Sequence, residues 1–470
     1  MTMDLEYSSY RDPIARIFYY NDEVYRFVDG DNFDYFHKIL ARPAVKKMMD
    51  SGDLIKTEVV EIADSAKVTA EFNSTKFLRH ERVKFISYPY EWPFSMFKEA
   101  ALFTLEMQKK LIAENLSLKD GTPYNVQFSG TKPVFIDFCS IEDISDNGVW
   151  FAYNQFMQMF VYPLILKVYR DISFRDLLLS NIDGIPHENA YQMAGLKPRI
   201  LPKLFPYLTL PKLFSVGSGE EAKKKDAKAS QKKINPQSNQ AVQTFMINRL
   251  IKLISGFNLP IKRSTWSDYS QTKSYADKDN QTKHEFLTNF YRDHEIKTTL
   301  DLGANTGEFS FIAEAAGSDV TAVDLDHNSV EKLYLLSREK KINILPLVVE
   351  LANPSPGIGW GNQERKSFLD RYRADCVLSL ALIHHLLISN RQPLSRIVDL
   401  FAQVSKRYLI TEYIGQKDSM FELLIMNRKE SYEYFNLDFF RTEFQKKFKI
   451  LQEVPLPNMD RRLFLMEKTE

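Results

Sequence analysis

The stretch between residues 298 and 324 constrains the fold of this chain more than any other. A short apolar run ends in Asp301, and a second apolar run ends in Asp324. Between them lies a helical pattern, preceded by a turn that contains Gly303, Asn305 and Gly307. Strand, small-residue turn, helix and a strand that ends in an acid predict a βαβ unit of the kind that binds a nucleoside cofactor.

The type of turn narrows the choice of cofactor. Small residues let a ligand approach the backbone, and an acid about 20 residues further on can accept hydrogen bonds from ribose hydroxyls. The turn is not GxGxxG, which disfavours a nicotinamide cofactor, and the chain has no GxxxxGK[ST] loop of the phosphate-binding type.

The second half of the chain predicts an α/β fold with a mostly parallel sheet. Strand-like runs alternate with helical patterns, which places helices on both faces of such a sheet. The last two runs have no helix between them, so they predict an antiparallel hairpin. The runs are 298–302, 320–323, 344–349, 375–382, 408–413, 449–453 and 462–466.

Residues 265–470 resemble a class I S-adenosylmethionine-dependent methyltransferase, which has a Rossmann-like seven-stranded sheet closed by a C-terminal hairpin. The resemblance rests on Asp301, Gly303, Gly307, Asp324 and the final hairpin, with Asn305 in place of the usual middle glycine. Asn tolerates a left-handed backbone better than most residues, so this departure is mild. The resemblance implies that Asp301 and the loop contact the amino-acid part of S-adenosyl-L-methionine. It also implies that Asp324 holds the ribose and that Glu350 lies near the adenine.

Three residues at strand ends are candidates for catalysis. The run 377–383 is followed by His384 and His385, and the run 408–413 contains Glu412. Ligands bind at the carboxyl ends of strands in open sheets. A neutral imidazole there can take a proton from a hydroxyl during methyl transfer. The alternatives are that one histidine packs under its loop, that the other caps a helix, and that Glu412 is solvated or caps a helix. Adjacent loop side chains are expected to point apart.

Arg365 is the candidate for substrate binding. It ends the segment 359–365, which follows the third strand run and resembles a family-specific insert. A guanidinium can grip an anionic group with two parallel hydrogen bonds. Core packing or a surface salt bridge is the alternative role.

The first half of the chain contains a weaker motif. Asp120 and Asn125 precede two short apolar runs joined by a Ser-Gly turn, and Asp137 follows the second run. This resembles the catalytic loop of protein-kinase-like phosphotransferases. The resemblance implies a kinase-like α+β domain in which Asp120 orients a hydroxyl, while Asn125 and Asp137 hold magnesium and thus Mg-ATP. The chain departs from that pattern, since no glycine-rich phosphate loop or VAIK-type lysine is evident. The alternative is that these side chains cap a turn and end a strand.

Composition suggests the domain boundary. The stretch 217–240 is rich in Lys, Ser, Ala and Gln without apolar periodicity, which is typical of a flexible linker. We therefore expect an N-terminal domain over 1–216, a linker over 217–240 and the methyltransferase domain over 241–470. Just before the linker, residues 197–214 mix prolines, basic residues and large apolar residues. This segment either packs across its own domain or makes a peripheral contact with a membrane surface.

Other classes of function are disfavoured. The net charge is +1, so no general attraction to nucleic acid is expected. The two cysteines, Cys139 and Cys376, give no metal or disulfide framework. No apolar run is long enough to span a membrane, and the first residues lack a signal-peptide core, so we expect a cytoplasmic protein. The oligomeric state is not indicated.

The sequence therefore predicts a methyltransferase that uses S-adenosylmethionine on a small-molecule or glycan-type acceptor. One alternative is a bifunctional kinase–methyltransferase that modifies a bacterial polysaccharide. Another is a non-catalytic scaffold that binds the cofactor.

Overall fold

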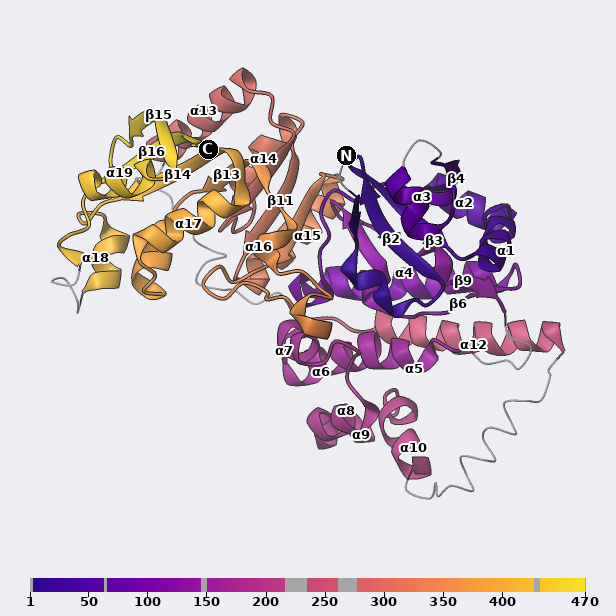
Figure 1. Ribbon diagram of the computed structural model, residues 1–470. Helices are drawn as coiled ribbons and strands as arrows, with labels where there is room; N and C mark the ends of the chain where they lie inside the picture. Colours follow the sequence, from indigo (N-terminus) through magenta and orange to yellow (C-terminus); the bar gives the residue numbers. More distant parts are fainter. Residues whose placement is uncertain are drawn as a thin grey trace. The chain divides into compact units, whose positions relative to one another are not determined.

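The computed structural model describes residues 3–62, 66–144, 150–215, 235–260, 277–426 and 432–469. The chain forms two compact units (Figure 1). The N-terminal unit contains Met1–Phe128, Pro133–Leu259 and Ile358–Arg365. The C-terminal unit contains Ser129–Lys132, Pro260–Gly357 and Lys366–Glu470.

These ranges differ from the boundaries expected from composition. Most of the predicted linker lies outside the described residues. Helix α12 (Pro236–Ser255) follows it but belongs to the N-terminal unit. There α12 packs along α4 (Phe94–Ile112), and Lys98 Nζ donates to the carbonyls of Ser255 at 3.0 Å and Phe257 at 2.6 Å. The C-terminal unit therefore takes up the chain near residue 260 rather than at 241.

Two short segments belong to the unit formed by the other half of the chain. Residues Ile358–Arg365 follow the third strand of the C-terminal sheet, but they are part of the N-terminal unit. Residues Ser129–Lys132, a turn in the first half of the sequence, are part of the C-terminal unit, where Gly130 approaches Asn343. A single boundary between two halves, as predicted, does not describe this chain.

The N-terminal unit opens with an antiparallel sheet in the order β1-β2-β3-β5-β4. The β2–β3 hairpin turns at Asn21 and Asp22, whose φ angles are 49° and 68°. Two left-handed residues in a two-residue loop match the right-handed twist of the strands. The strands are β1 (Met3–Leu5), β2 (Ala15–Tyr20), β3 (Glu23–Val28), β4 (Thr57–Glu61) and β5 (Lys76–His80).

The rest of the N-terminal unit is largely helical, with two small antiparallel pairs, β6–β9 and β7–β8. Its helices besides α4 and α12 are α1 (Gly30–Leu40), α2 (Pro43–Ser51), α3 (Ala66–Phe72), α5 (Tyr153–Phe156), α6 (Tyr162–Arg170), α7 (Phe174–Ser180), α8 (His187–Ala194), α9 (Leu196–Ile200) and α10 (Phe205–Ser215). The short strands are β6 (Leu116–Leu118), β7 (Val126–Ser129), β8 (Lys132–Phe135) and β9 (Ile141–Asp143).

The C-terminal unit is built on a seven-stranded sheet in the order β12-β11-β10-β13-β14-β16-β15. The first five strands in this order are parallel, and β14–β16 and β16–β15 are antiparallel. The sheet thus has seven strands and a closing hairpin. Its strands are β10 (Thr298–Leu302), β11 (Asp319–Asp324), β12 (Ile344–Val348), β13 (Ala374–Ser379), β14 (Ser405–Ile414), β15 (Phe448–Pro455) and β16 (Arg461–Lys468).

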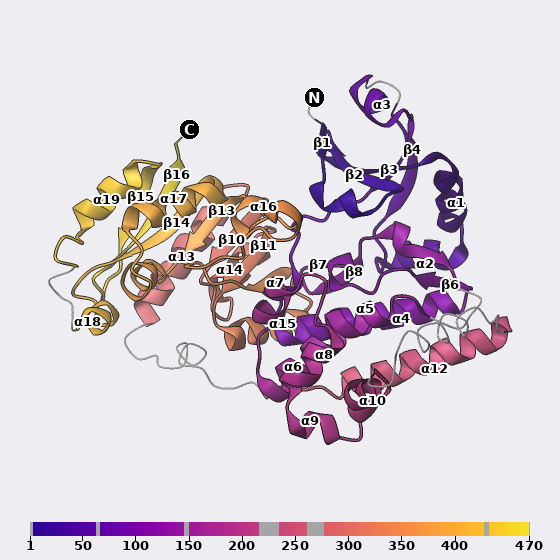
Figure 2. The same ribbon diagram turned by 60° about the horizontal axis from the view of Figure 1, so that its bottom comes forward.

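Helices cover both faces of this sheet (Figure 2). On one face α13, α14 and α15 share an apolar core with the central strands, and on the other α17 packs against α19. The helices are α13 (Asp277–Asp293), α14 (Glu308–Ala315), α15 (His327–Lys340), α16 (Phe368–Arg371), α17 (Leu394–Val404), α18 (Ser419–Ile425) and α19 (Leu437–Gln445). Because β10 to β14 run parallel, their carboxyl ends lie at the same edge of the sheet.

Among the described helices, none combines the length and the apolar character that crossing a membrane requires.

Candidate functional site at the strand ends of the C-terminal unit

The turn after β10 has the backbone that its residues predict. Gly303, Asn305 and Gly307 have φ angles of 77°, 51° and 86°. The N–H groups of Gly303 and Ala304 both donate to the carbonyl of Val323, at 2.8 and 3.0 Å. The turn is therefore pinned to the neighbouring strand β11, and α14 begins directly after it.

Both glycines are favoured by conformation, and an added Cβ at either position would press on a leucine side chain. A Cβ on Gly307 would lie 2.5 Å from Leu333 Cδ1, and one on Gly303 would lie 3.1 Å from Leu382 Cδ1. Left-handed φ angles are costly for residues with a Cβ, and Asn bears this cost better than most. Asn305 thus adopts a left-handed conformation that glycine also adopts readily.

Asp301 lies beneath this turn at the end of β10. Its carboxylate is buried and accepts a hydrogen bond from Ser310 Oγ at 2.6 Å. Burial raises the pKa of Asp301 to about 7, Ser310 opposes this rise, and the nearby charge of Asp324 adds to it. Near neutral pH this group is therefore poised between its two charge states.

Asp324 ends β11 and faces the same turn. Its Oδ2 accepts the N–H of Asn305 at 2.8 Å, and its Oδ1 accepts the N–H of Asp326 at 2.8 Å. Burial raises the pKa of Asp324, and the backbone donors oppose the rise. Each carboxylate oxygen can accept a second hydrogen bond, so both remain able to receive ligand hydroxyls. Glu350, two residues beyond β12, is exposed.

His384 and His385 follow β13 at the same edge of the sheet. Their ring centroids lie 4.0 Å apart at 42°, so the expectation that the side chains point apart was wrong. His384 is only 3% exposed, and its Nδ1 has no hydrogen-bond partner among the described residues. Burial lowers the pKa of His384 to about 2, helped by His385, Arg461 and Lys283. Burial also lowers the pKa of the half-buried His385.

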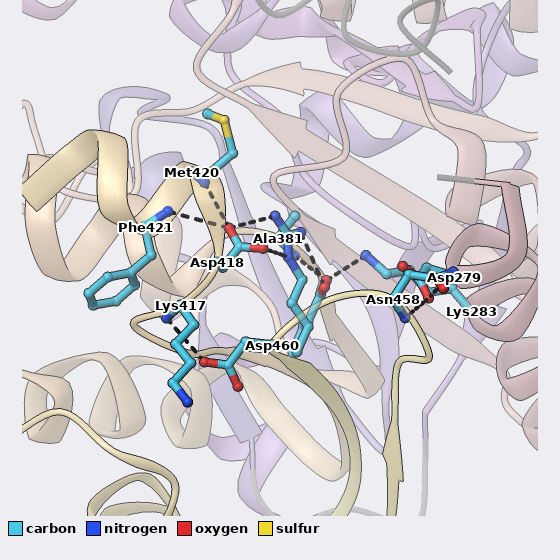
Figure 3. Close-up of polar contacts among 11 residues, drawn as sticks. Asp279, Lys283, Ala381, Lys417, Asp418, Met420, Phe421, Asn458 and Asp460 are labelled. Carbon is cyan, nitrogen blue, oxygen red and sulfur yellow. Dashed lines mark hydrogen bonds and ion pairs between the residues drawn. The ribbon is translucent and has the colours of Figure 1, made fainter. Parts of the chain in front are cut away.

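Glu412 is fully buried near the end of β14 and is the centre of a charged network. Figure 3 labels two of its partners, Lys283 and Ala381. Its Oε2 accepts from Lys283 Nζ at 2.7 Å and from the Ala381 N–H at 2.9 Å, and its Oε1 accepts from Arg461 Nη1 at 3.3 Å. Burial acts to raise the pKa of Glu412, but the two cations outweigh it and the pKa is lowered. Glu412 is therefore neither solvated nor a helix cap.

Arg461 extends the network to a second carboxylate. Its Nε and Nη2 donate to the two oxygens of Asp418 at 2.7 and 3.1 Å. Asp418 also caps α18 by accepting the N–H groups of Met420 and Phe421 (Figure 3). Two carboxylates and two cations thus neutralise one another, and they join α13, the loop after β13, β14 and the starts of α18 and β16.

Sequence reasoning missed most members of this network. Lys283, Ala381, Asp418 and Arg461 were not predicted as site residues. Asp418 carries a local signal, because an Asp before an apolar helical pattern is a typical N-cap. Lys283 carries none, since it pairs with a residue 129 positions away.

Arg365 is not part of the C-terminal unit, so its expected role in gripping a substrate stays a prediction. It belongs to the N-terminal unit, where its guanidinium lies 4.4 Å from the ring centroid of Tyr124. The adjacent Glu364 is buried and pairs with Arg11 at 2.9 Å. The segment 358–365 is therefore held to the N-terminal unit by stacking and by an ion pair.

The structure brings Asp120, Asn125 and Asp137 into one cluster in the N-terminal unit. Asn125 Nδ2 donates to Asp137 Oδ2 at 3.4 Å. Burial raises the pKa of Asp120, and the charge of Asp137 adds to this. Asp137 Oδ1, however, pairs with the buried Arg26 Nη1 at 2.6 Å.

The ion pair between Arg26 and Asp137 bears on whether this cluster can bind Mg-ATP. A magnesium ion would need the carboxylate that Arg26 and Asn125 already engage, so the residues as arranged do not fit the metal. Within the described ranges, no group of three or more His, Cys, Asp or Glu side chains is placed to hold a metal ion.

One curated protein resembles the chain along nearly its whole length. It is the nodulation protein NoeA of Rhizobium meliloti (strain 1021), which is 30% identical over 470 residues, covering 98% of this chain and 96% of the relative. No family model matches.

Solved structures resemble only part of the chain. The magnesium protoporphyrin IX methyltransferase ChlM from Synechocystis PCC 6803 with bound SAM is 15% identical with a TM-score of 0.30, covering 41% of this chain and 80% of that one. The N-methyltransferase NodS from Bradyrhizobium japonicum WM9 is 11% identical with a TM-score of 0.30, covering 41% and 98%. The bifunctional kinase-methyltransferase WbdD is 14% identical with a TM-score of 0.30, covering 43% and 41%. TM-scores this low do not establish a shared fold.

Proposed function

The chain belongs to the family of the nodulation protein NoeA, and we propose that its C-terminal unit transfers a methyl group from S-adenosylmethionine to a small-molecule or glycan-type acceptor. One observation carries the proposal. The left-handed turn at Gly303–Gly307 faces Asp324, at the edge of the sheet where His384 and His385 follow β13. Cofactor-binding and proton-accepting groups would thus share one edge.

The residues of this edge suit the cofactor. The turn has no Cβ at two positions, so a ligand can approach its backbone. Asp301 would hold the amino-acid part, Asp324 the ribose hydroxyls and Glu350 the region of the adenine. When bound, the cofactor supplies a methyl group on a positively charged sulfur. The residues around it then need only to position the acceptor and to manage its proton.

We assign different tasks to the three catalytic candidates. His385 is the more accessible imidazole, so it would accept the proton of the acceptor hydroxyl as the oxygen–carbon bond forms. His384 is too weak a base, since burial lowers its pKa to about 2, but its Nδ1 can accept a hydrogen bond and orient a neighbour. Glu412 would position the loop through the N–H of Ala381.

The class of acceptor is supported by charge. The chain carries 62 basic and 61 acidic residues, so it offers no general attraction to a polyanion such as nucleic acid. The non-catalytic alternative would keep the cofactor site and lack turnover.

Thermal shift and calorimetry with S-adenosylmethionine and S-adenosylhomocysteine test the cofactor. The wild type and Asp319→Ala should be stabilised, while Asp324→Ala should not, because Asp319 and Asp324 stand at opposite ends of β11. If no ligand stabilises the wild type, the proposal fails. Transfer of a labelled methyl group to oligosaccharides or small hydroxyl compounds then separates an enzyme from a scaffold.

A bifunctional kinase–methyltransferase is the second candidate, favoured by the meeting of Asp120, Asn125 and Asp137. It requires Arg26 to release Asp137. Stabilisation by Mg-ATP that disappears in Asp137→Asn would support it. An equal melting temperature with and without Mg-ATP would remove the kinase candidate and leave the methyltransferase proposal intact.

A further inference from the structure

Helices α8, α9 and α10 form a lobe of the N-terminal unit that exposes many large apolar side chains. In both views they lie together, at the end of that unit remote from its five-stranded sheet (Figures 1 and 2). Leu196, Ile200 and Leu213 are 77%, 74% and 61% exposed. We call the following set the lobe face: Met193, Leu196, Ile200, Phe205, Leu210 and Leu213.

The lobe is bonded internally and its helix α8 packs on α6, so this exposure does not reflect loose packing. Pro198, Leu204 and Leu208 are buried. His187 Nε2 contacts the carbonyl of Leu208 at 2.8 Å, and Thr209 Oγ1 donates to the carbonyl of Arg199 at 2.6 Å. The lobe therefore has one side packed on its own unit and another side that presents apolar residues outward.

Within each of the helices α9 and α10, the exposed apolar residues lie on one side. Leu196 and Ile200 are four apart in α9, and Leu210 and Leu213 are three apart in α10. Residues three or four apart lie on the same side of a helix. Several large apolar side chains exposed in one lobe indicate an interaction surface.

Charge decides which kind of surface the lobe face fits. Residues 187–215 contain four lysine or arginine residues and one carboxylate, Glu188. Lys197 is exposed between Leu196 and Ile200, and Lys203 is exposed just before Phe205. Lys212 is ion-paired with Glu188 at 2.6 Å, which leaves the excess positive charge around the outward apolar residues.

We infer that the lobe face docks on a membrane surface that contains anionic lipids. Apolar side chains would enter the boundary between headgroups and acyl chains, and the flanking lysines would meet lipid phosphates. Lysine is depleted at the core of protein–protein interfaces, whereas lysines beside Leu and Ile suit a surface of anionic lipids. This inference is independent of the proposed methyl transfer.

Sedimentation of the full-length chain with vesicles tests the inference. Vesicles of phosphatidylcholine with a minor share of phosphatidylglycerol should bind the wild type, and binding should weaken as salt is added. Leu196→Glu combined with Ile200→Glu should lower partitioning by about tenfold or more, since it removes apolar contact and adds repulsion. Lys197→Ala combined with Lys203→Ala should lower it by roughly tenfold, and only where anionic lipid is present.

Phe245→Glu is the matched control. Phe245 lies on α12, outside the lobe face, and is 62% exposed. The Phe245→Glu variant should bind vesicles as well as the wild type does. Every substituted residue is exposed, so melting curves should show that all variants fold.

Three results would overturn the inference. The first is a wild type that stays in the supernatant with anionic vesicles. The second is a loss of binding in Phe245→Glu equal to that in the double leucine–isoleucine variant. The third is self-association in the ultracentrifuge that the double variant abolishes while vesicles remain unbound, since that would assign the lobe face to a second copy of the chain.

Discussion

Ala381 donates its backbone N–H to Glu412 Oε2 at 2.9 Å, and it does so from a left-handed conformation with φ of 50°. A left-handed alanine costs about 1–2 kcal/mol. The bond to a buried carboxylate offsets this cost and fixes the start of the loop that carries His384 and His385. The geometry of this loop therefore depends on a side chain from the neighbouring strand.

Glu412→Gln should destabilise the C-terminal unit by about 3–5 kcal/mol, because it leaves Lys283 and Arg461 with one carboxylate fewer inside the protein. Unfolding in urea, followed by circular dichroism, measures this. Glu350→Gln is the control, since that carboxylate is exposed at another strand end and its loss should change stability by less than about 0.5 kcal/mol. Equal stability of the two variants would contradict the role of the network.

Comparing Gly307→Ala with Gly317→Ala separates the cost of crowding by an added Cβ from the cost of a left-handed backbone. Their φ angles are 86° and 89°, but a Cβ on Gly317 would meet nothing within 4 Å, whereas one on Gly307 would lie 2.5 Å from Leu333. Gly317→Ala should cost about 1–2 kcal/mol from backbone strain alone. Gly307→Ala should cost about 1–3 kcal/mol more from overpacking and should also weaken cofactor binding. Similar losses in both would show that the turn is not tightly packed.

Binding of S-adenosylmethionine should strengthen as pH rises through about 7. Burial raises the pKa of Asp301 from 3.8 to about 7, so its carboxyl group is largely protonated below that pH. Only the ionised form attracts the cofactor ammonium. Affinity measured by calorimetry should rise by up to about tenfold between about pH 6 and about pH 8. Asp301→Asn should flatten this dependence, and an unchanged slope would exclude Asp301 as its source.

Acid should destabilise the C-terminal unit through His384. The pKa of this imidazole is lowered from 6.5 to about 2 by burial, so below pH 6.5 the unfolded chain binds a proton that the folded chain does not. Stability should therefore fall with pH below 6.5, by up to about 1.4 kcal/mol per unit from this group. Urea unfolding across this range should give a shallower slope for His384→Asn than for the wild type. Identical slopes would show that His384 titrates normally.

His385→Asn should slow methyl transfer by roughly 10²-fold or more while leaving cofactor affinity unchanged, if His385 accepts the proton of the acceptor. The measurement pairs turnover with calorimetry on the same preparation. An acceptor that is already deprotonated should lessen the defect. Unchanged turnover in both His385→Asn and His384→Asn would remove histidine from the chemistry.

Local sequence patterns predicted the C-terminal unit well. Each predicted strand run overlaps a strand, although the run 375–382 extends past the end of β13, because apolar periodicity and turn residues act over a few positions. The left-handed turn at Gly303–Gly307 could be predicted for the same reason, because glycine and asparagine favour positive φ angles.

Features that depend on distant pairing could not be read in this way. The position of Glu412 was predicted, but its partners Lys283 and Arg461 come from a helix before the sheet and from the last strand. Arg365 follows a strand of the C-terminal sheet, yet its guanidinium packs on Tyr124 of the N-terminal unit, a partner that no local pattern indicates. Likewise, the composition of a linker does not show with which unit the next helix, α12, will pack.

The exchange of segments between the units limits how this protein can be divided. A gene cut near codon 260 would give one product without residues 358–365 and another without residues 129–132. The first product would lack the carboxylate that pairs with Arg11 and the guanidinium that stacks on Tyr124. Expression of the halves as separate polypeptides would thus reproduce neither unit, so neither unit can be inherited or exchanged without residues encoded in the other half.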